Sequence, residues 1–132
     1  MKIVPNTDPQ PFAAQNFTGP GDVQRLYVPV AEGNFGMATV VHHCDGSTSK
    51  PHSHAGGQYL FFVEGLGFVA EQGEAGVVES TVAPGTLVVT APGITHWHGA
   101  AAHADATVFS VTWGEIDWKH ETQDGAEQQP AG

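Results

Sequence analysis

Residues 46–65 read GSTSKPHSHAGGQYLFFVEG, and the spacing within this stretch decides the fold. His52 and His54 are two residues apart, so on a β-strand both imidazoles point to the same face. Gln58 follows a pair of glycines, which let the backbone bend, and it shares that face if the strand continues. If the face lines the interior of a barrel, the three side chains converge.

A second stretch, residues 85–100, reads GTLVVTAPGITHWHGA. His96 follows a Pro-Gly turn and can reach the same interior from a neighbouring strand. Three imidazole nitrogens and one amide oxygen suit a divalent metal ion and leave positions open for water or a substrate. We therefore predict a metal site formed by His52, His54, Gln58 and His96.

The composition favours one all-β domain. The chain has 132 residues, with 17 Gly, 9 Pro and 40% hydrophobic residues, which suits short strands joined by tight turns. The runs expected as strands are 23–30, 35–43, 52–58, 59–63, 68–72, 77–82, 86–90 and 108–113, with a further late strand at Trp97. We expect an N-terminal arm or edge strand at 1–20, a β-barrel at 21–120 and a flexible tail at 121–132. Only 115–123 has a helical pattern.

The charge argues against several classes of partner. The net charge of −10 would repel phosphate backbones and anionic lipids, so we expect neither nucleic acid nor membrane as a partner. The single Cys44 cannot form an internal disulfide, and the N-terminal residues lack the apolar run of a signal peptide. We expect a soluble, cytoplasmic protein that binds a small-molecule substrate.

The first stretch resembles the first motif of the cupin family, G-x5-H-x-H-x3,4-E-x6-G. The matching residues are Gly46, His52, His54, Gln58 and Gly65, with Gln58 in place of the usual Glu. The resemblance implies a single-domain cupin, which is a double-stranded β-helix or jelly-roll barrel.

The second stretch matches the second cupin motif, G-x5-P-x-G-x2-H-x3-N, in part. Gly85, Gly93 and His96 fit, while Ala91 and Ala100 replace the Pro and the Asn. A more specific resemblance is to small bacterial cupins that act as manganese-dependent hydroxynitrile lyases. These also carry H-x-H-x3-Q and a later H-W-H-G-A, which here lies at residues 96–100.

Phe17-Thr18-Gly19 and Asp117-Trp118 extend this resemblance over most of the chain. It implies a manganese site, lyase activity and pairing through strands and exposed aromatic residues, as a homodimer or homotetramer.

The resemblance also indicates a substrate pocket. Thr39 and Val41 are similar to small pocket residues of those lyases. Val108 stands where they have a pocket histidine, Thr112 stands where they have a glutamine, and Ser110 lies between these two positions. The predicted pocket is therefore Thr39, Val41, Val108, Ser110 and Thr112.

An amide ligand changes the expected chemistry. Three neutral histidines and Gln58 leave the ion its full 2+ charge, which favours Lewis-acid chemistry and disfavours a higher oxidation state. A mixed nitrogen and oxygen shell suits Mn²⁺ or Fe²⁺ best, and Ni²⁺, Co²⁺ or Zn²⁺ would also bind.

His98 lies two residues after His96 and faces the same way on a regular strand. It is either a general base near the metal or a residue that hydrogen-bonds a ligand histidine or a loop carbonyl. For His43 we favour a structural role. We expect Glu71, Glu74 and Glu79 to form the solvated face of a hairpin.

Three functions follow from this pattern. The first is a metal-dependent lyase acting on a small oxygenated molecule, with hydroxynitrile lyase as the nearest named activity. The second is a metal-dependent dioxygenase that uses O2. The third is a cupin that binds a small molecule without catalysis.

Overall fold

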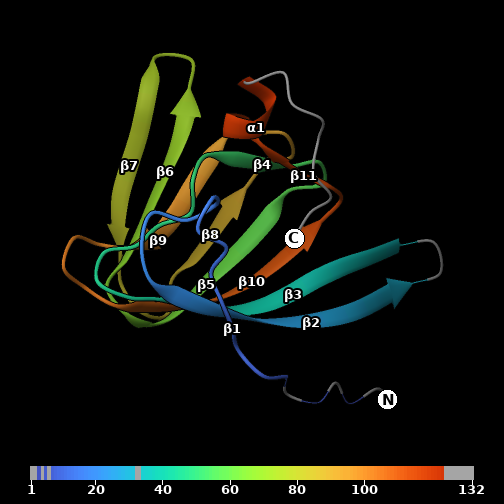
Figure 1. The fold of residues 1–132 in the computed structure, drawn as a ribbon. Helices are drawn as coiled ribbons and strands as arrows, with labels where there is room; N and C mark the ends of the chain where they lie inside the picture. The colour runs from blue at the N-terminus through green and yellow to red at the C-terminus, as the bar shows by residue number, and fades with distance from the viewer. Residues whose placement is uncertain (1–2, 4, 6, 32–33, 124–132) are drawn as a thin grey trace.

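Two antiparallel β-sheets face each other and enclose the interior of the molecule (Figure 1). The computed structural model describes residues 3, 5, 7–31 and 34–123, with the backbone alone for 27–31, 34–36 and 122–123. Eleven strands and one short helix lie within this part of the chain. The predicted all-β fold class is confirmed.

The first sheet has six strands in the order β1-β2-β3-β10-β5-β8. These strands are β1 (Gln10–Pro11), β2 (Gly21–Ala31), β3 (Asn34–His43), β5 (Gln58–Gly65), β8 (Leu87–Thr90) and β10 (Ala106–Trp113). Along β5, Leu60 and Phe62 are buried while Tyr59, Phe61 and Val63 are exposed. The period of two gives this sheet one face toward the core and one toward solvent.

The second sheet has five strands in the order β11-β4-β9-β6-β7. These strands are β4 (His52–His54), β6 (Gly67–Gly73), β7 (Gly76–Val82), β9 (His96–Ala100) and β11 (Ile116–Trp118). The β6–β7 hairpin rises at one side of the molecule (Figure 1), and β6 pairs with β9. The expected hairpin around residues 73–76 is therefore confirmed.

The hydrophobic core lies between the sheets. Its buried members are Val23, Val41, Leu60, Phe62, Val82 and Val108. Each such side chain stabilises the fold by about 1.5–3 kcal/mol relative to an exposed position. The core fills the part of the interior next to the predicted metal ligands.

One predicted element is wrong in part. The expected helix at 115–123 is helical only in α1 (Lys119–Gln123), because Ile116–Trp118 form β11 and pair with β4. Without β11, the backbone groups on that edge of β4 would have no partner strand.

The arm at 1–20 and the tail at 121–132 that the sequence indicates stay predictions. β1 pairs with β2, and Phe17 forms an isolated bridge with Ser49. Of the predicted tail at 121–132, residues 124–132 lie outside the described residues. No helix in the described part of the chain is both long and apolar enough to cross a membrane.

Candidate metal centre

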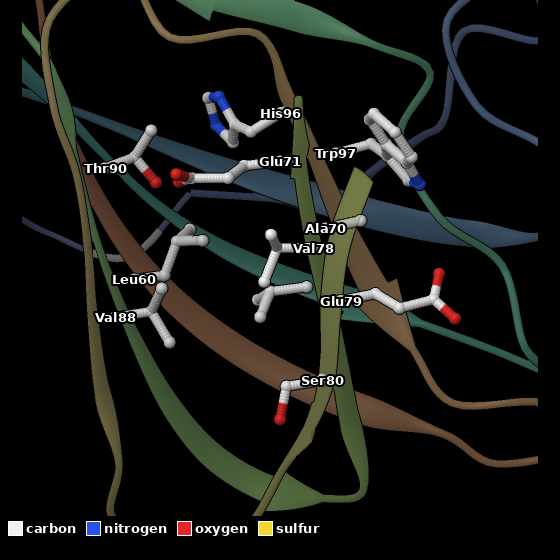
Figure 2. Close-up of a pocket in the computed structure, with 11 residues that line it drawn as sticks. Leu60, Ala70, Glu71, Val78, Glu79, Ser80, Val88, Thr90, His96 and Trp97 are labelled. Atoms are coloured by element: carbon white, nitrogen blue, oxygen red, sulfur yellow. The ribbon is translucent and has the colours of Figure 1, made fainter. Parts of the chain in front are cut away.

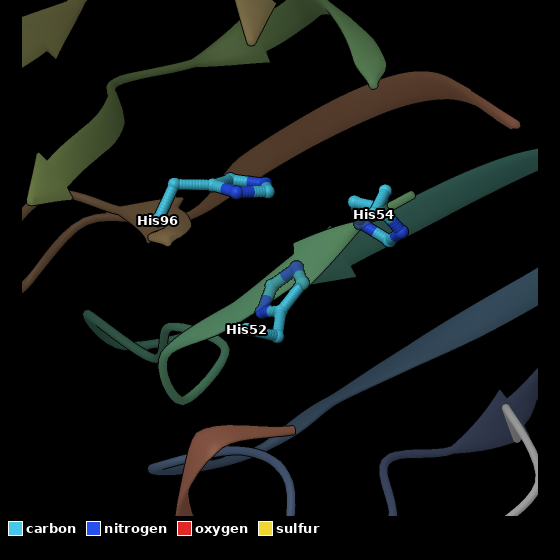
Figure 3. Close-up of side chains that lie close together, drawn as sticks. All are labelled: His52, His54 and His96. Carbon is cyan, nitrogen blue, oxygen red and sulfur yellow. The ribbon is translucent and has the colours of Figure 1, made fainter. Parts of the chain in front are cut away.

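Three histidines from the second sheet converge on one buried point. His52 and His54 come from β4, and His96 on β9 lies directly opposite His52 in the strand register. The ring centres lie 4.9 Å apart for His52 and His54, 4.5 Å for His52 and His96, and 5.4 Å for His54 and His96. One ring nitrogen from each lies within 4.8 Å of the others (Figure 3).

Gln58 reaches the same point by a different route from the one expected. β4 ends at His54, the chain turns through residues 55–57, and Gln58 begins β5 in the first sheet. Gly57 adopts a φ of 89°, a left-handed conformation that favours glycine. The bend at the two glycines is confirmed, whereas strand parity is the wrong reason for the convergence of Gln58 with the histidines.

Hydrogen bonds fix the protons on two of the imidazoles. Nδ1–H of His52 donates to the carbonyl of Lys50 at 2.7 Å, and Nδ1–H of His96 donates to the carbonyl of Ile94 at 3.0 Å. A carbonyl oxygen only accepts, so in the neutral rings Nε2 carries a lone pair. These contacts orient the two Nε2 atoms as ligands.

A contact between two acceptors supports a cation at this point. Oε1 of Gln58 lies 2.7 Å from Nε2 of His96, and neither atom has a proton to share. Adjacent ligands of a six-coordinate ion with bonds of about 2.1 Å lie about 3 Å apart. Nε2 of His54 is also buried without a hydrogen-bond partner among the described residues. The residues therefore fit a divalent metal ion.

The electrostatics keep the imidazoles neutral. Burial lowers the pKa of His54 to about 3, with a smaller contribution from His96, and burial lowers the pKa of His96 as well. Burial, followed by His96 and His54, lowers the pKa of His52 well below its usual value. Neutral imidazoles are the form that binds a metal.

His98 and Trp118 pack against these ligands. The ring of His98 is buried, and its centre lies 5.4 Å from that of His52 and 5.6 Å from that of His96. Nδ1 of His98 has no hydrogen-bond partner among the described residues. The ring centre of Trp118 in β11 lies 4.6 Å from that of His52. The strand that was expected as helix thus supports a ligand.

Solved structures show the same architecture. A cupin-like protein from Thermotoga maritima is 28% identical, covers 89% of this chain and 92% of its own, and superposes with a TM-score of 0.72. A predicted oxalate decarboxylase from the same organism has a TM-score of 0.68 at 16% identity, over 85% of this chain and 98% of its own.

The chain has the cupin fold. No family model matches the sequence. Among curated proteins, an (R)-mandelonitrile lyase from Granulicella tundricola is 34% identical over 83 residues, which is 60% of this chain. The match spans 61% of that enzyme's length. The resemblance to cupins and to a lyase of this kind, expected from the motifs, is confirmed.

The predicted substrate pocket lies on the inner face of the first sheet of the barrel. Val41 and Val108 face each other across β3 and β10 and belong to the core, and the hydroxyls of Thr39 and Ser110 are hydrogen-bonded. Thr112 lies opposite Gln58 and donates to the carbonyl of Met37 at 3.3 Å. Their role toward a substrate remains a prediction.

A cavity of about 140 Å³ opens beside His96, between β8 and the β6–β7 hairpin. It is lined by none of the five predicted pocket residues. Glu71 lies opposite His96 in the register, and Figure 2 shows its carboxylate reaching toward Thr90 of β8. Glu71 is solvent-exposed, as expected, but it also lines this cavity. The position of Glu71 beside His96 follows from the pairing of β6 with β9, and no local sequence pattern predicts that pairing.

Proposed function

We propose that this chain is a metal-dependent lyase that acts on a small oxygenated molecule, with cleavage and synthesis of a cyanohydrin as the specific reaction. The buried cluster of three neutral histidines, with an uncharged oxygen from Gln58, carries the proposal. The mandelonitrile lyase that matches part of the chain supports the reaction class. For the ion we propose Mn²⁺ or Fe²⁺, with His52, His54, Gln58 and His96 as ligands.

The bound ion would supply Lewis-acid activation of a hydroxyl or carbonyl group. His98 is the proposed base. Burial, followed by His52 and the other nearby histidines, lowers the pKa of His98 well below its usual value, so the ring is neutral but is a weaker base than a free imidazole. The proposed proton transfer therefore requires that the bound ion would make the substrate hydroxyl more acidic.

In cleavage, His98 removes the hydroxyl proton of the cyanohydrin. The carbon–oxygen bond becomes a carbonyl, the carbon–carbon bond to the nitrile breaks, and cyanide leaves with the electron pair. In synthesis, the protonated His98 returns the proton to the new alkoxide. The buried surroundings of the ring exclude the water that would otherwise exchange this proton.

The test combines manganese-loaded protein with benzaldehyde and cyanide at acidic pH, followed by chiral chromatography. We expect one enantiomer of the cyanohydrin in excess over the reaction without protein. His98→Ala should remove this excess and retain the metal. A racemic product formed at the background rate would contradict the lyase.

The same preparation separates the other two functions. Oxygen uptake with an enol or diketone, without cyanohydrin formation, would identify a dioxygenase. Ligand binding without turnover across both substrate panels would identify a binding protein.

A further inference from the structure

The carboxylate of Glu71 lies beside the metal centre without belonging to it. Glu71 is directly opposite His96 where β6 pairs with β9, so the two side chains share one face of the second sheet. The donor atoms that lie within 4.8 Å of one another come from the three histidines and not from Glu71. Glu71 therefore faces the cluster from outside the proposed ligand set.

The charge of Glu71 acts on the nearest ligand. Burial lowers the pKa of His96, whereas the carbonyl of Ile94 and, after it, the charge of Glu71 raise it. A carboxylate that favours a positive charge on this imidazole also attracts a cation bound to it. The attraction is stronger for a divalent ion, because the ion carries twice the charge of a protonated imidazole.

The cavity beside His96 connects these two residues with solvent. Glu71, Val78 and Glu79 line it and are exposed, whereas His96 lines it and is buried. Its volume of about 140 Å³ holds several water molecules of roughly 30 Å³ each. Neither Lys nor Arg is among the lining residues. The cavity therefore admits a cation with part of its hydration shell, and no positive side chain in its lining opposes entry.

Glu79 is a second carboxylate at this cavity, and it has a different orientation. It follows Val78 on β7, and neighbouring residues of a strand project to opposite faces. Val78 is opposite Glu71 in the register, so Glu79 belongs to the other face of the hairpin. Figure 2 shows the carboxylate of Glu71 on the side of His96 and that of Glu79 directed away from it. The two residues carry the same charge and differ in their direction toward the cluster.

We propose that Glu71 controls the entry of the metal ion: its carboxylate attracts a hydrated divalent cation into the cavity and, once the ion is bound, compensates part of its charge from outside the ligand set. This inference rests on the metal centre of the proposed function and not on the lyase reaction. A carboxylate at the mouth of a cavity raises the rate at which cations associate, and added salt reduces this effect.

Stopped-flow fluorescence of the metal-free full chain, mixed with Co²⁺, tests this role. Co²⁺ quenches tryptophan emission at short range, and the ring centre of Trp118 lies 4.6 Å from that of the proposed ligand His52. Displacement of the ion into an excess of EDTA gives the dissociation rate constant. We expect Glu71→Gln to lower the association rate constant about tenfold at low ionic strength and to weaken its dependence on salt.

Two variants control for net charge and for side-chain shape. Glu79→Gln removes the same charge from the same cavity, and Glu71→Asp keeps the charge. We expect both to associate with Co²⁺ within about twofold of the unaltered protein. Equal slowing by Glu71→Gln and Glu79→Gln would show that net charge alone sets the rate, and would overturn the proposal. Unchanged association in Glu71→Gln, or Glu71→Asp as slow as Glu71→Gln, would overturn it as well.

His52→Ala separates this inference from the metal centre itself. Binding of Co²⁺ that is weakened by His52→Ala and unchanged by Glu71→Gln would support the metal centre and overturn the role of Glu71. Binding that His52→Ala leaves unchanged would overturn both. Association that depends on Glu71, in a protein that forms no cyanohydrin, supports the role of Glu71 and contradicts the lyase alone.

Discussion

The amide oxygen of Gln58 lies 2.7 Å from Nε2 of His96, and both atoms are acceptors. In the absence of a cation, the two lone pairs repel each other. A carboxylate at position 58 would add a negative charge to the same place. The amide thus keeps the cluster uncharged. Metal binding would then depend on how well the four neutral donor atoms are positioned, without the attraction of a negatively charged ligand.

Variants at two ligand positions test this cluster. We expect His52→Ala and Gln58→Ala to lower metal affinity by about tenfold or more, because each removes one donor. Gln58→Glu should bind the metal more tightly than the unaltered protein, because its charge attracts the cation. Elemental analysis of proteins purified side by side measures the metal content. Unchanged content in both alanine variants would show that the ligand set is wrong.

His43 provides a pH-dependent term in stability. Burial, with a smaller contribution from His42, lowers the pKa of His43 from 6.5 to about 4. Between these pH values the unfolded chain binds the proton more readily than the folded chain. The contribution of neutral His43 to the free energy of unfolding is therefore fully present above pH 6.5. It is lost progressively as the pH decreases toward 4. This group alone accounts for about 3 kcal/mol.

Urea unfolding of the metal-free protein at pH 7 and at pH 4.5 measures this term. We expect His43→Leu to lose less stability between the two pH values than the unaltered protein. If both proteins lose the same free energy, His43 does not titrate in this range. The ring packs between Phe12, Phe17 and His98, so the comparison uses the pH dependence rather than the absolute stability.

The sequence predicts the individual metal ligands better than it predicts the residues that lie next to them. The spacing of His52 and His54, and the turn before His96, are local features, so the motif carries them. Glu71 and Thr90 meet His96 only because β6, β8 and β9 come together in space. Contacts across strands distant in the chain leave no local pattern.

The corner between β4 and β5 positions Gln58. A Cβ atom at Gly57 would lie 2.9 Å from the carbonyl oxygen of Thr90, on the strand that pairs with Gln58. Gly85 has a similar φ of 87° with no atom within 4 Å of an added Cβ. The two glycines therefore differ in their surroundings, whereas an alanine at either position would have a strained backbone.

We expect Gly57→Ala to reduce metal affinity by about tenfold, because the corner must shift and move Gln58 with it. Gly85→Ala should cost about 1 kcal/mol of stability from backbone strain and leave metal affinity unchanged. Calorimetric titration with Mn²⁺ and thermal unfolding measure the two effects. Equal metal affinity in both variants would show that the corner does not set the position of the ligand.

The strands themselves follow from alternation of apolar and polar residues, and most were predicted within a few residues. The exception is β11, where the sequence indicates a helix. Pairing with β4 determines the structure there, because it satisfies the backbone and places Trp118 against His52. A tertiary contact thus overrides a local preference.

The outer face of the first sheet is apolar over two neighbouring strands. Tyr59, Phe61 and Val63 of β5 lie beside Leu87 and Val89 of β8, and all five are exposed by 41–60%. A contiguous exposed patch of this kind is typical of an interface. We propose that a second copy of the chain covers it, in agreement with the homodimer or homotetramer expected from the sequence.

Sedimentation velocity tests this assembly. We expect the unaltered protein to sediment as a dimer or tetramer and Phe61→Lys to shift it toward the monomer, because a buried unpaired charge opposes association. Val77→Lys, on an exposed strand outside this patch, is the control. A monomer in the unaltered protein at micromolar concentration would contradict the assembly.

The ligands of the proposed ion come from both layers of the molecule, with the three histidines in one sheet and Gln58 in the other. An ion held by all four would connect the two layers through metal–ligand bonds. Any breathing motion that parts the sheets there would have to break the bond to the amide, the weakest of the four donors. The bond to Gln58 would then hold the two sheets together, and a bound small molecule would exchange at the rate at which the sheets separate.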